Sequence, residues 1–167
     1  MGRVLRRFWW VPAGAAVLAV LAVAASTLWP AAKPTRLPVR ARVYAATQVC
    51  LLTPPAGLAD PRAAAAWAGM RDASSRTRAQ VRYLSVVGQD SAGNTEPYLA
   101  SLAVGGCEAV LVTDGSGAAA VTAEGARFAK VRFLVLGGTG HGVNVSSISY
   151  LEPAQARAAV AAAVERL

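Results

Sequence analysis

Short apolar runs alternate with Ala-rich segments through the C-terminal part of the chain. This alternation restricts the possible folds more than any other feature of the sequence. Each run has six or seven residues, is rich in Val and Leu, and is followed by Pro, Gly or Asp within a few residues. The runs are 48–53, 81–87, 108–113, 131–136 and, more weakly, 143–149. Strands separated by helices predict βαβ units and a parallel sheet.

The segments between these runs carry helix signals. Asp60 is predicted to be the N-cap of a helix over 60–73, and Pro61 is predicted to be its first helical residue. Further helices are predicted over 95–104 and 118–129, and from Glu152 to Leu167. Right-handed crossovers place helices on both faces of the sheet. We therefore expect a single α/β domain with a doubly wound, five-stranded parallel sheet of order 2-1-3-4-5, numbered along the chain.

An uncharged apolar segment, residues 8–29, precedes this domain. As a helix, such a segment would span about 33 Å, enough to cross the hydrocarbon core of a bilayer. Trp9 and Trp10 lie at one end and Trp29 at the other, where aromatic rings favour the membrane interfaces. The segment predicts a transmembrane anchor.

A cleaved signal peptide is the alternative. Arg3, Arg6 and Arg7 precede an apolar stretch over 11–22, and 22–24 reads Ala-Val-Ala, a pattern of signal-peptidase sites. We favour the anchor because the apolar run continues past this point. The expected organisation is a basic tail (1–7), an anchor or uncleaved signal (8–29), a Pro/Arg linker (30–45) and the domain (46–167). The expected location is the cell membrane, single-pass, with a cytoplasmic N-terminus and an extracytoplasmic domain.

Charge is distributed unevenly. The chain has 17 Lys and Arg against 9 Asp and Glu. Residues 1–42 hold seven bases and no acid, which leaves 10 bases and 9 acids in 43–167. A nucleic-acid-binding domain is expected to carry a basic excess on its folded part. We therefore expect that the domain does not bind nucleic acid. The expected partner is the membrane, through the apolar residues 8–29.

Several stretches of the domain resemble the N-terminal lobe of the basic membrane protein (BMP) family. These proteins are substrate-binding lipoproteins of ABC transporters with the type I periplasmic-binding-protein fold. The similar stretches are VCLLTPPAGLADP (49–61), AWAGM (66–70), Gly105-Gly106 before Glu108, AKVRFLVL (129–136) and VNVSSISY (143–150).

The resemblance implies a non-enzymatic lobe without a cofactor that binds a small polar, nucleoside-like solute. The partner of this lobe would then be an ABC transporter or a second copy of the chain. Alternatively, the lobe would serve as an interaction module. This chain departs from the family in two ways. The resemblance covers one lobe where the family has two. Residues 59–63 lack the family's aromatic and amide, and Gly137 stands where the family has an acid.

Ligands of a parallel sheet bind at the carboxyl ends of its strands. The residues predicted there are Thr53, Asp60, Asp90, Asp114, Gly115 and Gly137. Asp60 and Asp114 also have the spacing of helix N-caps, and the cap is the stronger interpretation for both. The loop 137–142 is Gly-rich but lacks the Lys-Ser/Thr of a phosphate loop.

No catalytic pattern is present. His141 is the only histidine, no G-x-S-x-G motif occurs, and two cysteines with one histidine predict no zinc site. A membrane-tethered, flavodoxin-like domain that binds a cofactor or acts as an enzyme remains the alternative function.

Cys50 and Cys107 are candidates for a disulfide, since they fall in or beside neighbouring strands. An exported domain would permit the bond, whereas direct bridging of adjacent parallel strands fits disulfide geometry poorly. The sequence leaves both states open.

Overall fold

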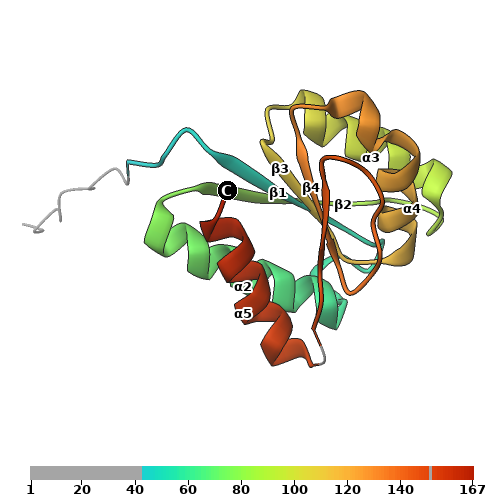
Figure 1. Cartoon of the computed structure of the whole chain (residues 1–167). Coiled ribbons are helices and arrows are strands. Elements are labelled where there is room, and N and C mark those ends of the chain that lie inside the picture. Colours follow the sequence, from blue (N-terminus) through green and yellow to red (C-terminus); the bar gives the residue numbers. More distant parts are fainter. Residues whose placement is uncertain (1–42, 151) are drawn as a thin grey trace, which may run out of the picture. The chain divides into compact units, whose positions relative to one another are not determined.

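A computed structural model describes residues 43–150 and 152–167 (Figure 1). Five parallel strands form one sheet in the order β2-β1-β3-β4-β5, which confirms the predicted order. The strands are β1 (Gln48–Thr53), β2 (Gln80–Ser85), β3 (Ala109–Val112), β4 (Arg132–Leu136) and β5 (Val145–Ile148).

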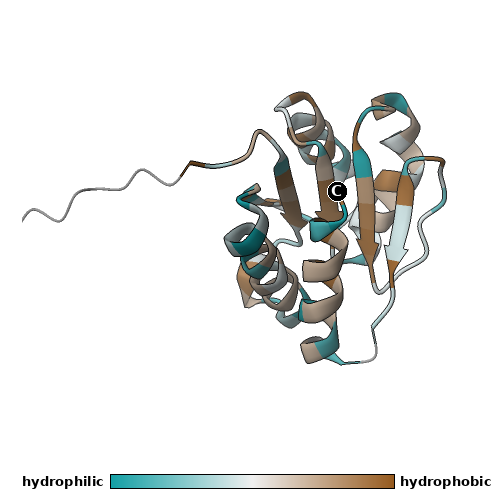
Figure 2. Ribbon diagram, turned by 60° about the vertical axis from the view of Figure 1, so that its left-hand side comes forward, coloured by the Kyte–Doolittle hydropathy of each residue, from teal (hydrophilic) through white to brown (hydrophobic). Residues whose placement is uncertain are grey.

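Helices cover both faces of the sheet. One layer holds α2 (Pro61–Thr77) and α5 (Pro153–Glu165), and the other holds α3 (Ala92–Val104) and α4 (Gly115–Glu124). Two short 3₁₀ helices, η1 (Gly57–Ala59) and η2 (Gly125–Phe128), follow β1 and α4. The apolar strands lie between the helix layers, as the hydropathy colouring of Figure 2 shows.

Alternation along the strands creates two cores. Val49 and Leu51 of β1 pack beneath α2 and α5, whereas Cys50 and Leu52 pack beneath α3 and α4. All four side chains are buried, because a strand covered on both faces has no solvent-facing side.

Several helix and strand boundaries differ from the predicted ones. Helix α3 begins three residues earlier than expected because the Ser91 hydroxyl caps it, accepting from the Asn94 N–H; Pro97 lies inside this helix. Helix α2 continues to Thr77 and stops where Arg78 takes a left-handed conformation (φ 65°).

Helix α4 is shorter at its end than predicted. It starts at Gly115 and gives way to a 3₁₀ turn after Glu124, where Gly125 packs against the ring of Phe133. Strands β2 and β5 end at Ser85 and Ile148, before the predicted 87 and 149.

The predicted tail (1–7) and anchor (8–29), and residues 30–42 of the predicted linker, lie outside the described residues. Within 43–150 and 152–167, no helix has the length and apolar character needed to cross a membrane.

Candidate functional site

The side of the sheet at which the strands end, here called the carboxyl edge, is the candidate site. The strand order reverses between β1 and β3, and helices leave these two strands toward opposite faces. Such a reversal separates the loops that follow the two strands and is the usual ligand position in doubly wound sheets.

Thr53 ends β1 at this edge and is buried. Its hydroxyl donates to Ser85 Oγ at 2.9 Å, at the end of β2. The two residues are register partners in the sheet, so the tertiary pairing of β1 with β2 creates this hydroxyl pair.

A second polar group joins the loop after β2 to the start of α4. The hydroxyl of Ser116 donates to the carboxylate of Asp90 and lies 3.2 Å from Asp114 Oδ1. Asp114 also accepts from the N–H of Gly117 and caps α4. One hydroxyl therefore lies between two carboxylates, both of which can accept hydrogen bonds from a ligand.

The other predicted residues take mainly structural positions. Asp60 Oδ1 accepts from the N–H groups of Arg62 and Ala63 at 2.9 Å, so the predicted N-caps are confirmed for Asp60 and Asp114. Gly115 is the first residue of α4, and the space where its Cβ would stand is open.

Gly137 closes β4 in a left-handed conformation, with φ 72°. A Cβ at this position would stand 2.7 Å from Cε1 of Tyr150. The loop that follows holds His141 exposed and leads into β5 rather than into a helix. The glycine is therefore required by the turn and by the close approach of the Tyr150 ring to the position that a Cβ would take.

Sequence reasoning missed Ser85, Ser116, Thr113 and Tyr150 at this edge. Thr113 follows β3, is fully buried, and its hydroxyl has no hydrogen-bond partner among the described residues. Ser116, within Asp-Gly-Ser-Gly (114–117), could have been predicted from the sequence, since a polar residue in the first turn of a capped helix faces the carboxyl edge. The positions of Ser85 and Tyr150 depend on strand pairing, and no local pattern in the sequence predicts them.

The carboxyl edge thus offers hydroxyl and carboxylate groups suited to hydrogen bonding with a polar ligand. In the described part of the chain, no three His, Cys, Asp or Glu side chains come together in a way that could hold a metal ion.

Cys50 and Cys107 form a disulfide on the opposite side of the sheet, with Cα atoms 5.9 Å apart. Cys107 precedes β3 by two residues, and the register partner of Cys50 is Val110. The bond therefore joins β1 to the approach of β3, and the spacing problem of two paired strand residues does not arise. Both cysteines are buried.

Arg82 lies over this disulfide. Its Nε lies 3.2 Å from the sulfur of Cys50, and its Nη2 lies 3.3 Å from that of Cys107 and 3.1 Å from the carbonyl oxygen of Gly105. The exposed guanidinium therefore shields the buried sulfurs from the solvent side.

Two hollows lie away from the carboxyl edge, and none of the predicted ligand residues lines them. One, of about 580 Å³, lies along α2 and includes Tyr44, Trp67, Arg71, Asp72 and Arg157. The other, of about 410 Å³, lies between β5 and α5.

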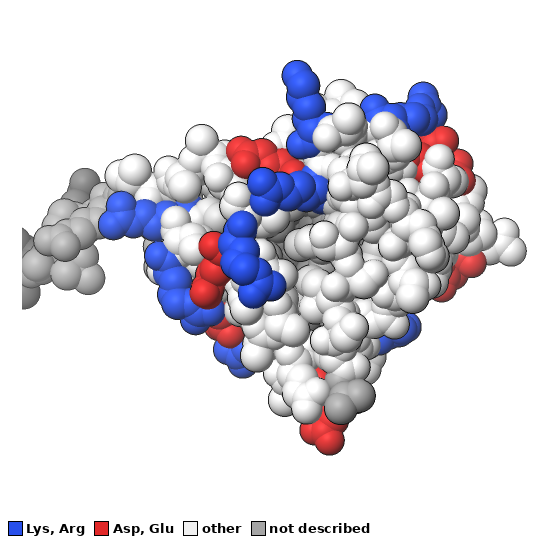
Figure 3. Space-filling model, in the orientation of Figure 1, with Lys and Arg blue, Asp and Glu red and all other residues white. Residues whose placement is uncertain are grey.

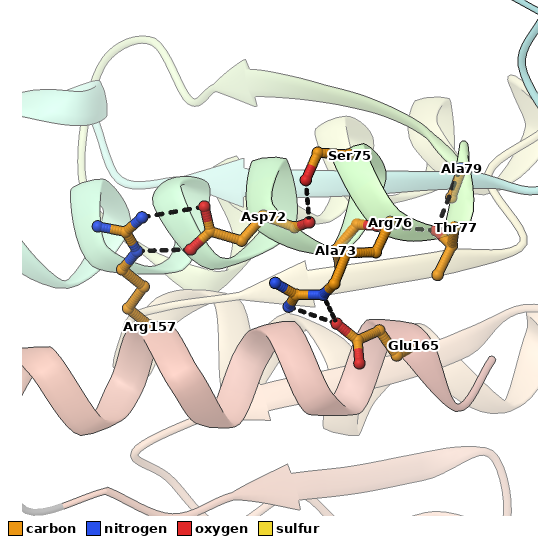
Figure 4. Close-up of polar contacts among 8 residues, drawn as sticks. All are labelled: Asp72, Ala73, Ser75, Arg76, Thr77, Ala79, Arg157 and Glu165. Carbon is orange, nitrogen blue, oxygen red and sulfur yellow. Dashed lines mark hydrogen bonds and ion pairs between the residues drawn. The ribbon is translucent and has the colours of Figure 1, made fainter.

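An ion pair joins α5 to α2 beside the first hollow (Figure 4). Arg157 donates to both carboxylate oxygens of Asp72. These hydrogen bonds lower the pKa of Asp72 and raise that of Arg157. Both groups therefore remain charged at neutral pH, and the pair ties the two helices together.

No family model matches this chain, and no curated protein is significantly similar to it. Two solved structures share its fold. A fragment of a protein assigned as a lipoprotein, from Peptoclostridium difficile 630, is 13% identical over 72% of this chain and 99% of its own length, with a TM-score of 0.58. A transcriptional activator of the comK gene from Bacillus halodurans is 19% identical over 60% of this chain and 33% of its own length, with a TM-score of 0.50. At these identities, the likeness establishes the fold alone.

Proposed function

We propose that this chain is a membrane-anchored, extracytoplasmic, non-enzymatic domain that acts by binding. The observation that carries this proposal is the buried Cys50–Cys107 disulfide in a chain that also has an export-type segment over 8–29. Disulfides of this kind persist in oxidising compartments and are rare in the cytosol. The lipoprotein with the same fold supports an exported location.

The anchor is proposed to be the apolar segment itself. Lipid attachment to a lipoprotein requires a cysteine at the end of the signal, and this chain has its first cysteine at position 50.

The proposed ligand is a small polar solute, nucleoside-like, held at the carboxyl edge by hydroxyls and carboxylates. Asp114 and Gly115 would meet it from the start of α4, Asp60 from the start of α2, and Thr53 and Gly137 from the strand ends. Because the resemblance to the BMP family covers one of that family's two lobes, a second lobe from a transporter partner or a second copy would complete the cleft. A lobe without ligand would serve as an interaction module.

Location is tested with the full chain expressed in bacteria. Membranes are denatured and treated with a maleimide–polyethylene glycol with and without prior reduction, and the mass shift is read on a gel. Denaturation exposes both buried cysteines, so only a disulfide protects them. We expect no modification without reduction and two modifications after it. The matched control lacks residues 8–29, should stay in the cytoplasm and should be modified twice without reduction. Reactive thiols in the full chain would contradict the proposed location.

Ligand binding is tested by native mass spectrometry of the purified full chain and by titration with a panel of nucleosides. Asp114→Asn is the informative variant, because Asn caps a helix about as well as Asp but carries no charge. We expect at least a tenfold loss of affinity with unchanged folding. Asp72→Asn, away from the carboxyl edge, should keep the affinity. A protein that carries no ligand and binds no nucleoside of the panel would contradict the ligand proposal. The role as an interaction module would then remain.

The sheet order 2-1-3-4-5 also favours the flavodoxin-like alternative, since flavodoxin-type domains share it. An absorbance spectrum of the purified chain distinguishes the two proposals. A flavin or nucleotide band would support the alternative, and a spectrum from protein alone would count against it.

A further inference from the structure

The charges of the described domain are separated along the strand direction. The amino edge is defined here as the side of the sheet at which the strands begin and the helices end. Most bases lie there, at strand starts, at helix ends or in the adjoining turns. They are Arg76, Arg78, Arg82, Arg127, Lys130, Arg132 and Arg166, against the acids Glu108, Glu124 and Glu165.

The carboxyl edge has the opposite balance. Its acids precede or open helices and lie in the loops that follow strands. They are Asp60, Asp90, Glu96, Asp114 and Glu152, against the single base Arg62. In Figure 3 several blue side chains lie over the C-terminal ends of α2 and α5, with red ones among them, and further blue side chains lie at the top of the view.

The parallel topology causes this separation. Acids are favoured near helix N-termini and bases near helix C-termini, where they complement the helix dipole. In an antiparallel helix bundle these preferences would cancel. Here α2, α3, α4 and α5 all run back from the carboxyl edge to the amino edge, so the local preferences add up to a dipolar domain.

Part of the basic charge at the amino edge is unneutralised. Arg76 pairs with Glu165, and Arg127 pairs with Glu124. Five other bases are exposed and form no ion pair with a carboxylate side chain among residues 43–150 and 152–167. They are Arg78, Arg82, Lys130, Arg132 and Arg166.

The chain enters the domain at this same edge. Ala45 donates its N–H to the carbonyl oxygen of Arg78 at 2.9 Å, and Thr47 accepts from the N–H of Gln80 at 2.9 Å. Residues 33–42, immediately upstream, add Lys33, Arg36, Arg40 and Arg42 and contain no acid.

We propose that the amino edge rests on anionic lipid headgroups of the membrane that anchors the chain. This inference depends on the proposed membrane anchor. Basic side chains are attracted to an anionic lipid surface within about a Debye length, roughly 8 Å at physiological salt. The chain enters the domain at the amino edge, so this edge is the one joined directly to the basic segment 33–42 and, through it, to the proposed anchor. The carboxyl edge, with its acids and candidate ligand groups, then faces away from the membrane.

The test uses the full chain in lipid nanodiscs with one fluorescent label. Val104 ends α3 at the amino edge and is 80% exposed, and Val87 follows β2 at the carboxyl edge and is 71% exposed. Val104→Cys and Val87→Cys form a matched pair, since the native cysteines are buried in a disulfide and do not react without reduction. The readout is quenching by a lipid with a spin-labelled headgroup.

In discs containing phosphatidylglycerol, we expect quenching at position 104 to be at least twice that at position 87. The contrast should fall in discs of phosphatidylcholine alone and at high salt. Lys130→Glu with Arg166→Glu should abolish the excess quenching. The control Arg62→Glu with Arg71→Glu changes the net charge equally, away from the amino edge, and should keep it.

Equal quenching at the two positions in anionic discs would overturn the docking while leaving the anchor intact. A contrast that survives Lys130→Glu with Arg166→Glu would do the same. A chain that does not enter the discs at all would overturn both the anchor and the docking.

Discussion

Arg157 of α5 holds Asp72 of α2 through two hydrogen bonds, Nε to Oδ2 at 2.6 Å and Nη2 to Oδ1 at 2.9 Å. A second ion pair, Arg76 with Glu165, joins the same helices further along (Figure 4). These helices are the first and last α-helices of the described residues. They share one apolar core, and the two ion pairs link them at its exposed margin.

The Asp72–Arg157 pair predicts a pH dependence of stability. Hydrogen bonding by Arg157 lowers the pKa of Asp72 in the folded state. The contribution of Asp72 to stability is therefore complete above the unfolded pKa, about 3.9, and is lost as pH falls through the lower folded pKa. We expect Asp72→Asn to lower the melting temperature at pH 7, with a difference that shrinks below about pH 4. Thermal unfolding across this range tests it, and a difference independent of pH would contradict it.

Gly69 is expected to be intolerant of any side chain. Its Cβ would stand 2.4 Å from the carbonyl oxygen of Arg157, a backbone atom of α5. Gly69→Ala would force α2 and α5 apart and should destabilise the domain by about 1–3 kcal/mol, as overpacking does. The control is Gly93→Ala in α3, where nothing lies within 4 Å; it should be neutral or slightly stabilising. Urea unfolding of both variants decides, and equal stabilities would refute the close-packing argument.

Asn144 is expected to be a structural residue. Its Nδ2 lies within hydrogen-bond distance of the carbonyl oxygens of Gly125, Phe128 and Val131, at 3.1, 3.1 and 2.9 Å. Asn144→Ala would leave partly buried carbonyl groups without these donors and should lower the free energy of unfolding by about 1–3 kcal/mol. Ser146→Ala, at an exposed position of β5, should change it little. A loss no larger than that of Ser146→Ala would contradict this role.

The disulfide is expected to stabilise the domain substantially. It closes a loop with a sequence separation of 57, for which the loop-entropy model gives about 4 kcal/mol. The double variant Cys50→Ala, Cys107→Ala should unfold at lower urea concentration than the oxidised protein. Reduced native protein should match the double variant, and unchanged stability after verified reduction would contradict the expectation.

Much of the fold was predictable from local signals. The apolar runs 48–53 and 131–136 lie between Pro, Gly and charged residues, and each became a buried strand. The start of α2 followed from Asp60-Pro61. The predicted start of α3 was wrong, because Glu96-Pro97 resembles a helix start although the helix begins after the cap at Ser91. Asn94 supports that cap by donating to the carbonyl oxygens of Val87 and Gln89.

The candidate site was predictable only as a location. A parallel sheet directs Thr53, Asp114 and Gly137 to one edge, whatever their contacts are. Which of them meet could not be predicted, because Thr53–Ser85 and Asp90–Ser116 join residues on different strands and loops.

The sequence by itself determined the order and type of the elements, the helix caps at Asp60 and Asp114, and the excess of bases in residues 1–42. Each of these depends on neighbouring residues, through apolar spacing, capping and local charge. Only the tertiary structure decided that Cys50 meets Cys107, that Arg157 holds Asp72, and that the bases collect at the amino edge. The first two contacts span 57 and 85 residues. The third needs every helix to run back along the sheet, so it arises only because all five strands pair in parallel.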